Sequence, residues 1–390
     1  MRCLPVVVLS GLRQTGKSTL LQREDALTSG RVYRTLDDFP TLAAARANPA
    51  GLLSEAVALD EVQRCPDLLM EIKRAVDQER VPGRFLLSGS ANLALIGAVA
   101  ETLAGRAVYL TLHPMTRREI TRRTGKPPFL TEWLGNPTLP EGQADPIRDE
   151  ENLRGGLPPA CLGPDDGLDE WFRGYVQTYV ERDVRQLSQI TDLLAFRMFA
   201  LLAALRTSQV LVISGLARDA GLSATTAARY LDLLEASFLV RRLPPFMRNR
   251  SARLIKSPKL FVTDAGLAAH LVGVRGLRSG QEQLMRGALL ETYVAQNLSA
   301  ILEAHLPDAR LTYWHEQGRH EVDFVIENGQ EVTAIEVKAA SRWTDGDLSG
   351  LRAFMRRTPE RSTGILAYNG NLAVALGDRL YAIPLGHLLA

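Results

Sequence analysis

The residues best suited to chemistry form an eight-residue stretch, GLRQTGKS, at positions 11–18. Its spacing, G-x-x-x-x-G-K-[ST], is that of a phosphate-binding loop, in which two glycines let backbone N–H groups curl around phosphate oxygens. The lysine can reach the β- and γ-phosphates of a nucleotide, and the hydroxyl after it can hold Mg²⁺. We therefore predict ATP and Mg²⁺ as cofactors, bound by this loop and the residue after it: Gly11, Arg13, Gln14, Thr15, Gly16, Lys17, Ser18 and Thr19.

Two carboxylates stand at the end of a later apolar run, residues 56–59. Asp60 could bind Mg²⁺ through water or together with Ser18, and Glu61 could orient the water that attacks the γ-phosphate. A further apolar run, residues 85–87, ends in hydroxyl side chains. Ser88 is therefore a candidate sensor of the γ-phosphate, with Ser90 and Asn92 as alternatives, although residues 88–90 could instead cap a following helix.

To act on one nucleotide, these groups must lie at the same edge of a sheet. The pattern of apolar runs predicts such a sheet. Short apolar runs at 5–9, 32–36, 56–59, 85–87 and 107–112 alternate with amphipathic stretches such as 68–76. Alternation of this kind indicates an α/β fold with a parallel sheet covered by helices. Because ligands of open parallel sheets bind at the carboxyl ends of the strands, we expect the loop, both carboxylates and Ser88 to meet there.

Together these elements resemble an AAA-type ATPase of the additional-strand-catalytic-glutamate class. More narrowly, the chain is similar to a bacterial and archaeal family of ATP-binding proteins in which this ATPase is fused to a carboxy-terminal domain of unknown function. The resemblance extends over most of the chain. It rests on the phosphate loop and on the strings Leu59-Asp60-Glu61-Val62-Gln63, Leu87-Ser88-Gly89-Ser90, Leu103-Ala104-Gly105-Arg106 and Gly155-Gly156-Leu157-Pro158.

The resemblance has two further implications for the nucleotide site. Arg106 could touch nucleotide as a finger or sensor, and its alternative role is a surface arginine that pairs with a carboxylate. Relatives usually carry a helical segment ahead of the first strand that helps to enclose the adenine, whereas only a few residues precede that strand here. Either Met1 is a late start or the base pocket is thin, which bears on the affinity for nucleotide.

The middle of the chain combines a connector with a helix-turn-helix pattern. Residues 126–159 are rich in Pro, Gly and acidic side chains, which predicts a connector or an exposed loop. Two helices around Gly221, followed by hairpin strands at 238–243 and 259–262, predict a winged helix. Its interior, residues 241–259, holds seven Lys or Arg and no acid, so together with Thr225, Thr226 and Arg229 it could contact a DNA backbone. A packing module or a protein-contact surface is the alternative.

The carboxy-terminal region carries a second set of carboxylates. Two β-rich runs, 321–326 and 331–338, flank Asn328-Gly329, which is a signal for a two-residue hairpin turn. That turn would place Asp323 opposite Ala334 and make Asp323 and Glu336 diagonal neighbours on one face of the sheet. Both carboxylates would then be close enough to hold one Mg²⁺.

Two more residues complete this constellation. Lys338 lies on the same predicted face and could orient water or stabilise charge that develops at phosphorus, and Glu291 comes from a predicted helix over 285–302. The set Glu291, Asp323 and Glu336-Val337-Lys338 resembles the PD-(D/E)XK restriction-endonuclease-like superfamily, which implies a nuclease fold. Such domains can lose turnover while keeping these residues, and charged alternation on a solvated strand often produces the bare pattern, so cleavage itself stays open.

Length, charge and composition set limits on the whole chain. With 390 residues we expect a P-loop AAA-type ATPase domain at 1–125, a linker and helical connector at 126–190, a winged helix at 191–278 and a nuclease-like domain at 279–390. A net charge of +2 excludes a chain that is basic throughout, so any DNA contact must be local. Three scattered cysteines, no signal-type segment and no long apolar run favour a cytoplasmic protein without a membrane partner, and they leave an oligomer open.

Two functions are compatible with these residues. The leading expectation is an ATP-hydrolysing protein whose nucleotide state repositions a winged helix and a Mg²⁺-dependent nuclease-like domain on DNA. The rival is an ATP-dependent signalling switch or scaffold in which the nuclease-like domain is a catalytically inactive interaction module. Metal-dependent DNA cleavage that Glu336→Ala abolishes would separate them.

Overall fold

The computed structural model describes residues 4–24, 27, 30–89, 102–178, 190, 192–247, 256–277, 280–316, 319–358 and 362–390. The chain divides into two compact units. The first comprises Met1–His113, Thr178–Ile190 and Asp232–Phe238, and the second comprises Pro114–Gln177, Thr191–Leu231 and Leu239–Ala390. Three of the four domains expected from the sequence thus fall largely within one unit.

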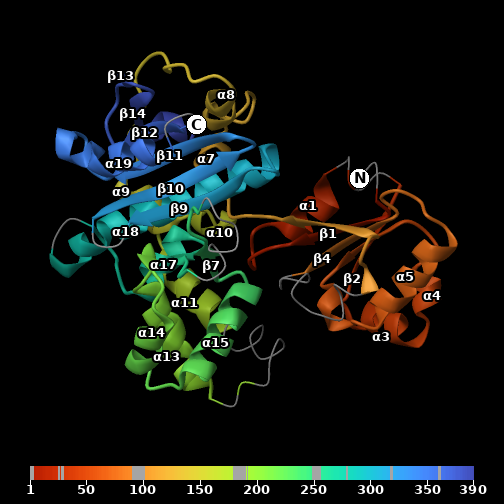
Figure 1. Cartoon of the computed structure of the whole chain (residues 1–390). Coiled ribbons are helices and arrows are strands. Elements are labelled where there is room, and N and C mark those ends of the chain that lie inside the picture. The colour runs from red at the N-terminus through yellow and green to blue at the C-terminus, as the bar shows by residue number, and fades with distance from the viewer. Residues whose placement is uncertain are drawn as a thin grey trace. The chain divides into compact units, whose positions relative to one another are not determined.

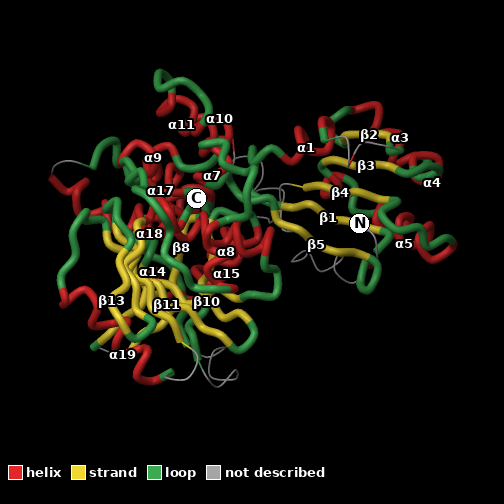
Figure 2. Tube along the Cα trace, turned by 90° about the horizontal axis from the view of Figure 1, so that it is seen from above, coloured by secondary structure: helices red, strands yellow, loops and turns green. Residues whose placement is uncertain are grey.

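The first unit is built on a five-stranded parallel sheet. Its strands are β1 (Val6–Ser10), β2 (Val32–Thr35), β3 (Val57–Asp60), β4 (Phe85–Gly89) and β5 (Ala107–Thr111). They lie in the order β2-β3-β4-β1-β5, which Figure 2 shows clearly. Strand β4 therefore stands between the strand that leads into the phosphate loop and the strand that ends in Asp60. The predicted parallel sheet is confirmed.

Helices cover both faces of this sheet because its central strands are apolar on both sides. Val6 and Val8 of β1 pack with α3 (Phe39–Ala47), α4 (Pro49–Leu52) and α5 (Leu68–Gln78), and Val7 and Leu9 pack with Leu21 of α1 (Lys17–Arg23). Figure 1 shows these helices around the sheet. A short 3-10 helix, η1 (Val62–Arg64), follows β3. The helices on both faces hold the sheet in place, including its carboxyl edge, where β1 leads into α1.

The second unit contains a six-stranded mixed sheet in the order β13-β14-β12-β11-β10-β9. The strands are β9 (Arg310–Glu316), β10 (His320–Asn328), β11 (Glu331–Lys338), β12 (Ser362–Tyr368), β13 (Val374–Gly377) and β14 (Leu380–Pro384). Strands β9, β10 and β11 form an antiparallel meander, and β12 and β14 continue the sheet parallel to β11. The edge strand β13 pairs antiparallel with β14.

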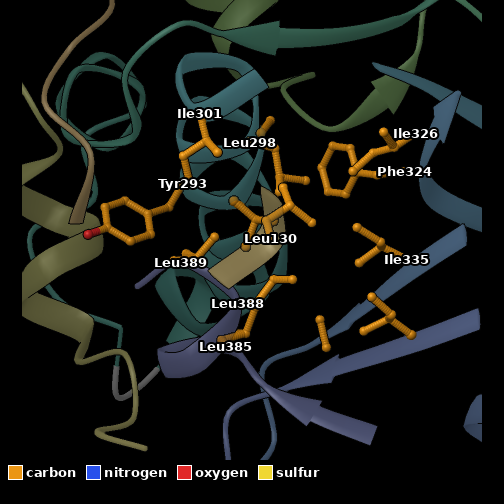
Figure 3. Close-up of a cluster of buried hydrophobic side chains, with 14 of the residues drawn as sticks. Leu130, Tyr293, Leu298, Ile301, Phe324, Ile326, Ile335, Leu385, Leu388 and Leu389 are labelled. Atoms are coloured by element: carbon orange, nitrogen blue, oxygen red, sulfur yellow. The ribbon is translucent and has the colours of Figure 1, made fainter. Parts of the chain in front are cut away.

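Helices cover both faces of this sheet. The long helix α18 (Gly280–His305) packs its Leu298 and Ile301 against the face that carries Phe324 and Ile335, together with α8 (Phe129–Gly135) and α20 (Leu385–Leu388) (Figure 3). On the other face, α19 (Ser349–Arg357) inserts Phe354, and η3 (Asp345–Leu348) precedes it. Apolar residues alternate along each strand between the two faces, which is what a sheet covered on both sides requires.

A helix-turn-helix region shares this core. It consists of α13 (Leu193–Ala204), α14 (Ile213–Asp219), α15 (Ala224–Ala236) and three short antiparallel strands, β6 (Gln209–Val210), β7 (Val240–Leu243) and β8 (Lys259–Val262), in the order β6-β8-β7. Gly221 turns between α14 and α15 with φ 66°, and the Ser223 hydroxyl accepts the Thr226 N–H at 3.1 Å. Leu243 and Phe261 enter the same apolar cluster as α18.

Of the two structures expected for residues 126–159, a connector or an exposed loop, the exposed loop is wrong for part of that stretch. Its helices α8 and α9 (Asp149–Arg154), with α10 (Pro158–Cys161), belong to the second unit, and Leu130, Trp133 and Leu157 are buried there. A few large apolar side chains are enough to anchor such a segment, even where composition favours a loop. The remaining helices of the unit are α7 (Arg117–Ile120), α11 (Leu168–Thr178) and α17 (Ala265–Leu271).

The glycine pair Gly155-Gly156 lies where backbone and side chain approach closely. A Cβ at Gly155 would stand 2.3 Å from Oδ1 of Asp264, and the Gly156 N–H donates to Oδ2 of that carboxylate at 2.7 Å. Asp264 also caps α17 by accepting the Leu267 N–H at 2.8 Å. The Gly155-Gly156 pair thus packs closely on Asp264 at the start of α17 and joins the segment after α9 to that helix. This role is structural. Within the described part of the chain, no helix has the length and apolarity needed to cross a membrane.

Candidate nucleotide site and carboxylate cluster

The phosphate loop closes on itself through its lysine. Gly16 has φ 98° and Gln14 has φ 61°, so the chain turns through left-handed backbone before α1 begins. The Lys17 ammonium donates to the carbonyls of Gly11 at 2.9 Å and Leu12 at 2.8 Å. A Cβ at Gly11 would lie 2.3 Å from the Leu112 carbonyl oxygen, so only glycine fits there. The loop is therefore shaped by the residues that the sequence motif specifies.

Asp60 is held at the end of β3 by three donors. Its Oδ2 accepts the Tyr33 hydroxyl at 2.9 Å, and its Oδ1 accepts the Glu61 N–H at 3.1 Å and the hydroxyl of the fully buried Ser88. The carboxylate keeps free lone pairs, and together with the Ser18 hydroxyl it is the hard oxygen donor set that Mg²⁺ prefers. The structure thus fixes the orientation of Asp60 from three strands: β2, β3 and β4.

Glu61 lies next to this carboxylate in a strained position. Its backbone is left-handed, with φ 59°, and its side chain accepts a hydrogen bond from the Gln63 amide. Burial raises the pKa of Glu61, and the negative charges of Asp60 and Asp37 raise it further. A left-handed backbone costs conformational free energy in a non-glycine residue, and the residue keeps it only where the surrounding contacts hold it in place.

Ser88→Ala tests the role of this hydroxyl. We expect the change to lower ATP turnover and to cost about 1 kcal/mol of stability, because a buried hydrogen bond to Asp60 is lost. Steady-state hydrolysis and thermal unfolding measure the two effects. Unchanged turnover in a folded variant would leave Ser88 with a capping role alone.

Of the remaining residues predicted to contact nucleotide, some lie at the phosphate loop and one does not. Arg13 and Thr19 belong to the loop and α1, and the Thr15 hydroxyl donates to the Leu12 carbonyl at 2.9 Å. Arg106 precedes β5 at the amino edge of the sheet, opposite to the phosphate loop, and its guanidinium binds both oxygens of Asp77 at 2.7 and 2.9 Å. The structure does not bring Arg106 to the loop of its own chain. Ser90 and Asn92 lie outside the described residues.

The second unit holds a buried lysine at the centre of three carboxylates. The Lys259 ammonium lies 2.6 Å from Glu291 Oε1, 2.8 Å from Glu321 Oε1 and 3.2 Å from Asp323 Oδ1. Lys259 is 1% exposed, although the sequence suggested that it belongs to a basic wing. The second oxygen of Glu291 accepts the Ser208 hydroxyl at 2.6 Å. Elements β8, α18 and β10 therefore meet at this point.

The predicted register of the β10–β11 hairpin is wrong by two residues. Phe324 pairs with Ile335 and Val325 with Ala334, so Asp323 lies opposite Glu336 rather than Ala334. Asn328 stays in the ladder opposite Glu331, and the turn is made by Gly329 with φ 61° and the residue after it. A glycine at the first central position is the preference of a type II′ turn. Because the shift is even, both carboxylates keep the predicted face.

Hydrogen bonds tie these two strands together at the cluster. Asp323 Oδ2 accepts the Val337 N–H at 2.9 Å, and the Lys338 ammonium lies 3.0 Å from Glu336 Oε1 and 3.7 Å from Asp347. The structure thus brings together all four predicted residues of this site. Their centre holds Lys259, a residue that the motif does not contain.

Burial and excess negative charge govern the protonation of the cluster. Burial, followed by the charge of Asp323, raises the pKa of Glu291 to about 8, and the same causes raise the pKa of Glu336 to about 8. Burial by itself would lower the pKa of Lys259, but the attraction of Asp323, Glu291 and Glu321 outweighs it and the net effect is a higher pKa. Four carboxylates share two ammonium groups here, so protons neutralise part of the remaining charge.

Several contributors to these sites were given no role from the sequence, among them Glu321 and Ser208, which contact Lys259 and Glu291. Tyr33 and Gln63 orient Asp60 and Glu61, but a tyrosine on an edge strand and a glutamine after the carboxylates carry no distinctive signal. Lys259 could have been found: it alternates with Phe261 on an apolar strand, and Phe261 faces the core. A lysine on the core face of a strand implies a buried counter-charge.

Comparison with known families finds three successive matches along the chain. Residues 4–121 match an AAA domain, residues 148–278 match a domain of unknown function, DUF8612, and residues 286–388 match a second domain of unknown function, DUF4143. The first match contains the phosphate loop, Asp60, Glu61 and Ser88. The last contains the four carboxylates of the cluster, Glu291, Glu321, Asp323 and Glu336, whereas Lys259 lies in the DUF8612 match.

Relatives cover nearly the whole chain. Uncharacterized proteins of Mycobacterium tuberculosis and Mycobacterium bovis are each 30% identical over 99% of this chain and 81% of their own length. An uncharacterized protein of Haemophilus influenzae is 21% identical over 70% of both chains. With an AAA domain at one end and DUF4143 at the other, the chain belongs to the family of AAA-type ATPases fused to a carboxy-terminal DUF4143 domain, together with these mycobacterial proteins.

Proposed function

We propose that this protein binds and hydrolyses ATP in its first unit and that the nucleotide state controls how its second unit engages DNA. The observation that carries the proposal is the arrangement around Asp60, where Ser88, Tyr33 and the Glu61 amide orient one carboxylate at the edge that bears the phosphate loop. Positioned carboxylates beside a phosphate loop are what in-line attack of water on a γ-phosphate requires.

Each residue has a distinct part in this reaction. Lys17 binds the β- and γ-phosphates, the loop from Gly11 to Thr19 surrounds them, and Ser18 with Asp60 would hold Mg²⁺. The bound ion would neutralise the phosphate charge. Glu61 orients water and accepts its proton, and Gln63 keeps that carboxylate in place. Ser88 links Asp60 to the neighbouring strand, so that the γ-phosphate and the metal ligand are sensed together.

DNA contact is assigned to helix α15. Thr225 and Arg229 are one turn apart and exposed, and the side chain of Arg218 on α14 is 81% exposed. Side chains of this kind at the start of a second helix suit the phosphates and groove edges of a duplex. The basic segment between β7 and β8 would add to this surface, but Arg248, Arg250 and Arg253 lie outside the described residues, and Lys259 is buried.

Arg229→Glu is expected to weaken binding to duplex DNA by about tenfold or more and to reduce its dependence on salt, because a phosphate contact becomes a repulsion. Fluorescence anisotropy at several salt concentrations, with and without ATP, measures both effects. Arg356→Glu, at an exposed site on α19, is the matched control and should bind as the parent does. Equal affinities for all three proteins would remove α15 from the DNA-binding surface.

A second function, an ATP-dependent switch with a catalytically silent nuclease-like domain, is favoured by one observation. The carboxylates that a nuclease would use already surround the ammonium of Lys259. Cleavage of plasmid or single-stranded DNA with Mg²⁺ or Mn²⁺, lost in Glu336→Ala with folding intact, supports the nuclease. The absence of cleavage across these substrates and metals supports the switch.

A further inference from the structure

We propose that the ammonium group of Lys259 is the resident cation of the carboxylate cluster, and that it competes with a divalent metal ion for the same place. The nuclease-like domain would therefore hold no metal while β8 lies in the described position. Three carboxylates, from Glu291, Glu321 and Asp323, lie within 3.2 Å of the Lys259 nitrogen. The ammonium donates hydrogen bonds to Glu321 and Asp323 and forms an ion pair with Glu291, so all three carboxylates are held by one cation.

The oxygens that a metal would need are already engaged. Asp323 offers Oδ1 to Lys259 and Oδ2 to the Val337 N–H, and Glu291 offers its oxygens to Lys259 and Ser208. A divalent ion that bridged the same two oxygens at about 2.1 Å would be in contact with the ammonium, and like charges so close repel strongly. Among the described residues, no group of three or more His, Cys, Asp or Glu side chains is disposed to hold a metal ion. The residues present therefore do not fit the Mg²⁺ that the nuclease-like resemblance implies.

The lysine cannot leave while its strand stays in place. Lys259 is opposite Leu243 of β7 and opposite Val210 of β6, so β8 is the central strand of its sheet. Two residues on, Phe261 stacks on Phe324 of β10 with ring centres 5.8 Å apart. Access of a metal to the cluster is thus coupled to the position of β8, and through β8 to the helix-turn-helix region.

Removal of the ammonium would free carboxylate oxygens that could then close around a divalent ion, although their described positions do not form a metal site. Asp323 and Glu291 would each lose a partner, and Glu336 Oε2 is already buried without a hydrogen-bond partner among the described residues. Hard carboxylate oxygens of this kind are the usual ligands of Mg²⁺ and Mn²⁺. The choice of these ions as competitors rests on the proposed nuclease-like function, whereas the place of Lys259 does not.

The test is a titration of Mn²⁺ into full-length protein without nucleotide, with free Mn²⁺ followed by electron paramagnetic resonance. An Asp60→Asn background removes the metal ligand of the nucleotide site. Lys259→Met keeps the length of the side chain and removes its charge, and it should bind one Mn²⁺ at least about tenfold more tightly than the parent. Adding Asp323→Asn should abolish the gain, and Lys256→Met, at an exposed position nearby, should behave as the parent does.

Two results would overturn the proposal: equal Mn²⁺ affinity in the parent and Lys259→Met, or tight binding by the parent that Asp323→Asn removes. The second comparison needs no Lys259 variant, so it decides the matter even if Lys259→Met does not fold. Calorimetry with ATP on Lys259→Met with Asp60 intact reports on the proposed ATPase separately. If the unmodified protein, with Asp60 intact, does not bind ATP, the proposed function is refuted. The result of the metal titration would still stand.

Discussion

Glu61→Gln is expected to bind ATP with the affinity of the parent and to hydrolyse it about a hundred- to ten-thousandfold more slowly. An amide has the same shape as a carboxylate but cannot accept the proton of the attacking water. The residue lies next to Asp60 and is held by Gln63, so the substitution should disturb the chemistry and leave the loop that binds the phosphates unchanged.

The pH dependence of hydrolysis gives this prediction a second measure. Burial and the charges of Asp60 and Asp37 raise the pKa of Glu61, so a fall in turnover on the acid side should begin at a higher pH than an ordinary glutamate would give. Below that pKa the residue is protonated and cannot act as a base. The acid limb of the kcat profile should be absent from Glu61→Gln.

Two variants complete the experiment. Lys17→Ala should lose most of its affinity for ATP, because the ammonium that reaches the phosphates is gone, and calorimetry separates this effect from that of Glu61→Gln. Glu55→Gln changes an exposed glutamate of the same unit, whose contact is a 3.5 Å pair with Arg34, and should match the parent. Parent-like binding in Lys17→Ala combined with parent-like turnover in Glu61→Gln would contradict the assigned roles.

The sequence was most informative where one residue type alone satisfies a local requirement. Gly16 needs a left-handed backbone, and Gly11 needs to pass close to the Leu112 carbonyl, so the loop motif predicted a tight turn between β1 and α1. The alternation of apolar runs predicted the parallel sheet for a similar reason. A buried parallel strand must be apolar on both faces, and few other elements give that pattern.

Prediction failed where long-range packing decides between local alternatives. The Asn328-Gly329 pair suits a tight turn, but it does not say which two residues occupy the centre, and the observed pairing of Asn328 with Glu331 moved the register by two. Composition also favoured an exposed connector where Trp133 is buried. At Trp133 a contact with Tyr381, distant in sequence, outweighs the local preference, whereas in the hairpin two neighbouring turn positions are close alternatives.

Lys259 illustrates the same limit at a candidate site. Within its own segment the lysine belongs to a run of basic residues, which favours contact with nucleic acid. Only the fold places it beside carboxylates 32 to 64 residues further along the chain. The charge it brings changes the chemistry of the carboxylate cluster, so a motif made of carboxylates and one lysine cannot by itself establish a metal site.

The stability of the second unit is expected to fall as the pH rises from about 5 to about 8, by an amount on the order of a few kcal/mol. The folded-state pKa values of Glu291 and Glu336 are raised to about 8 from ordinary values near 4.5. The folded protein therefore holds protons that the unfolded chain releases, and the stabilisation they give is complete below the unfolded pKa and is lost as the pH passes the folded pKa. Lys259 adds no slope in this window, because its pKa is raised from 10.5.

Glu291→Gln and Glu336→Gln should each flatten this dependence, because a neutral amide has no proton to release. Hydrogen exchange of the amides in β10 and β11, measured between pH 5 and 9 and corrected for the intrinsic rate, reports on the second unit by itself. Glu331→Gln, at an exposed position at the start of β11, is the control and should keep the slope of the parent. Protection that increases with pH, or equal slopes in all four proteins, would show that Glu291 and Glu336 are ionised in the native cluster at neutral pH.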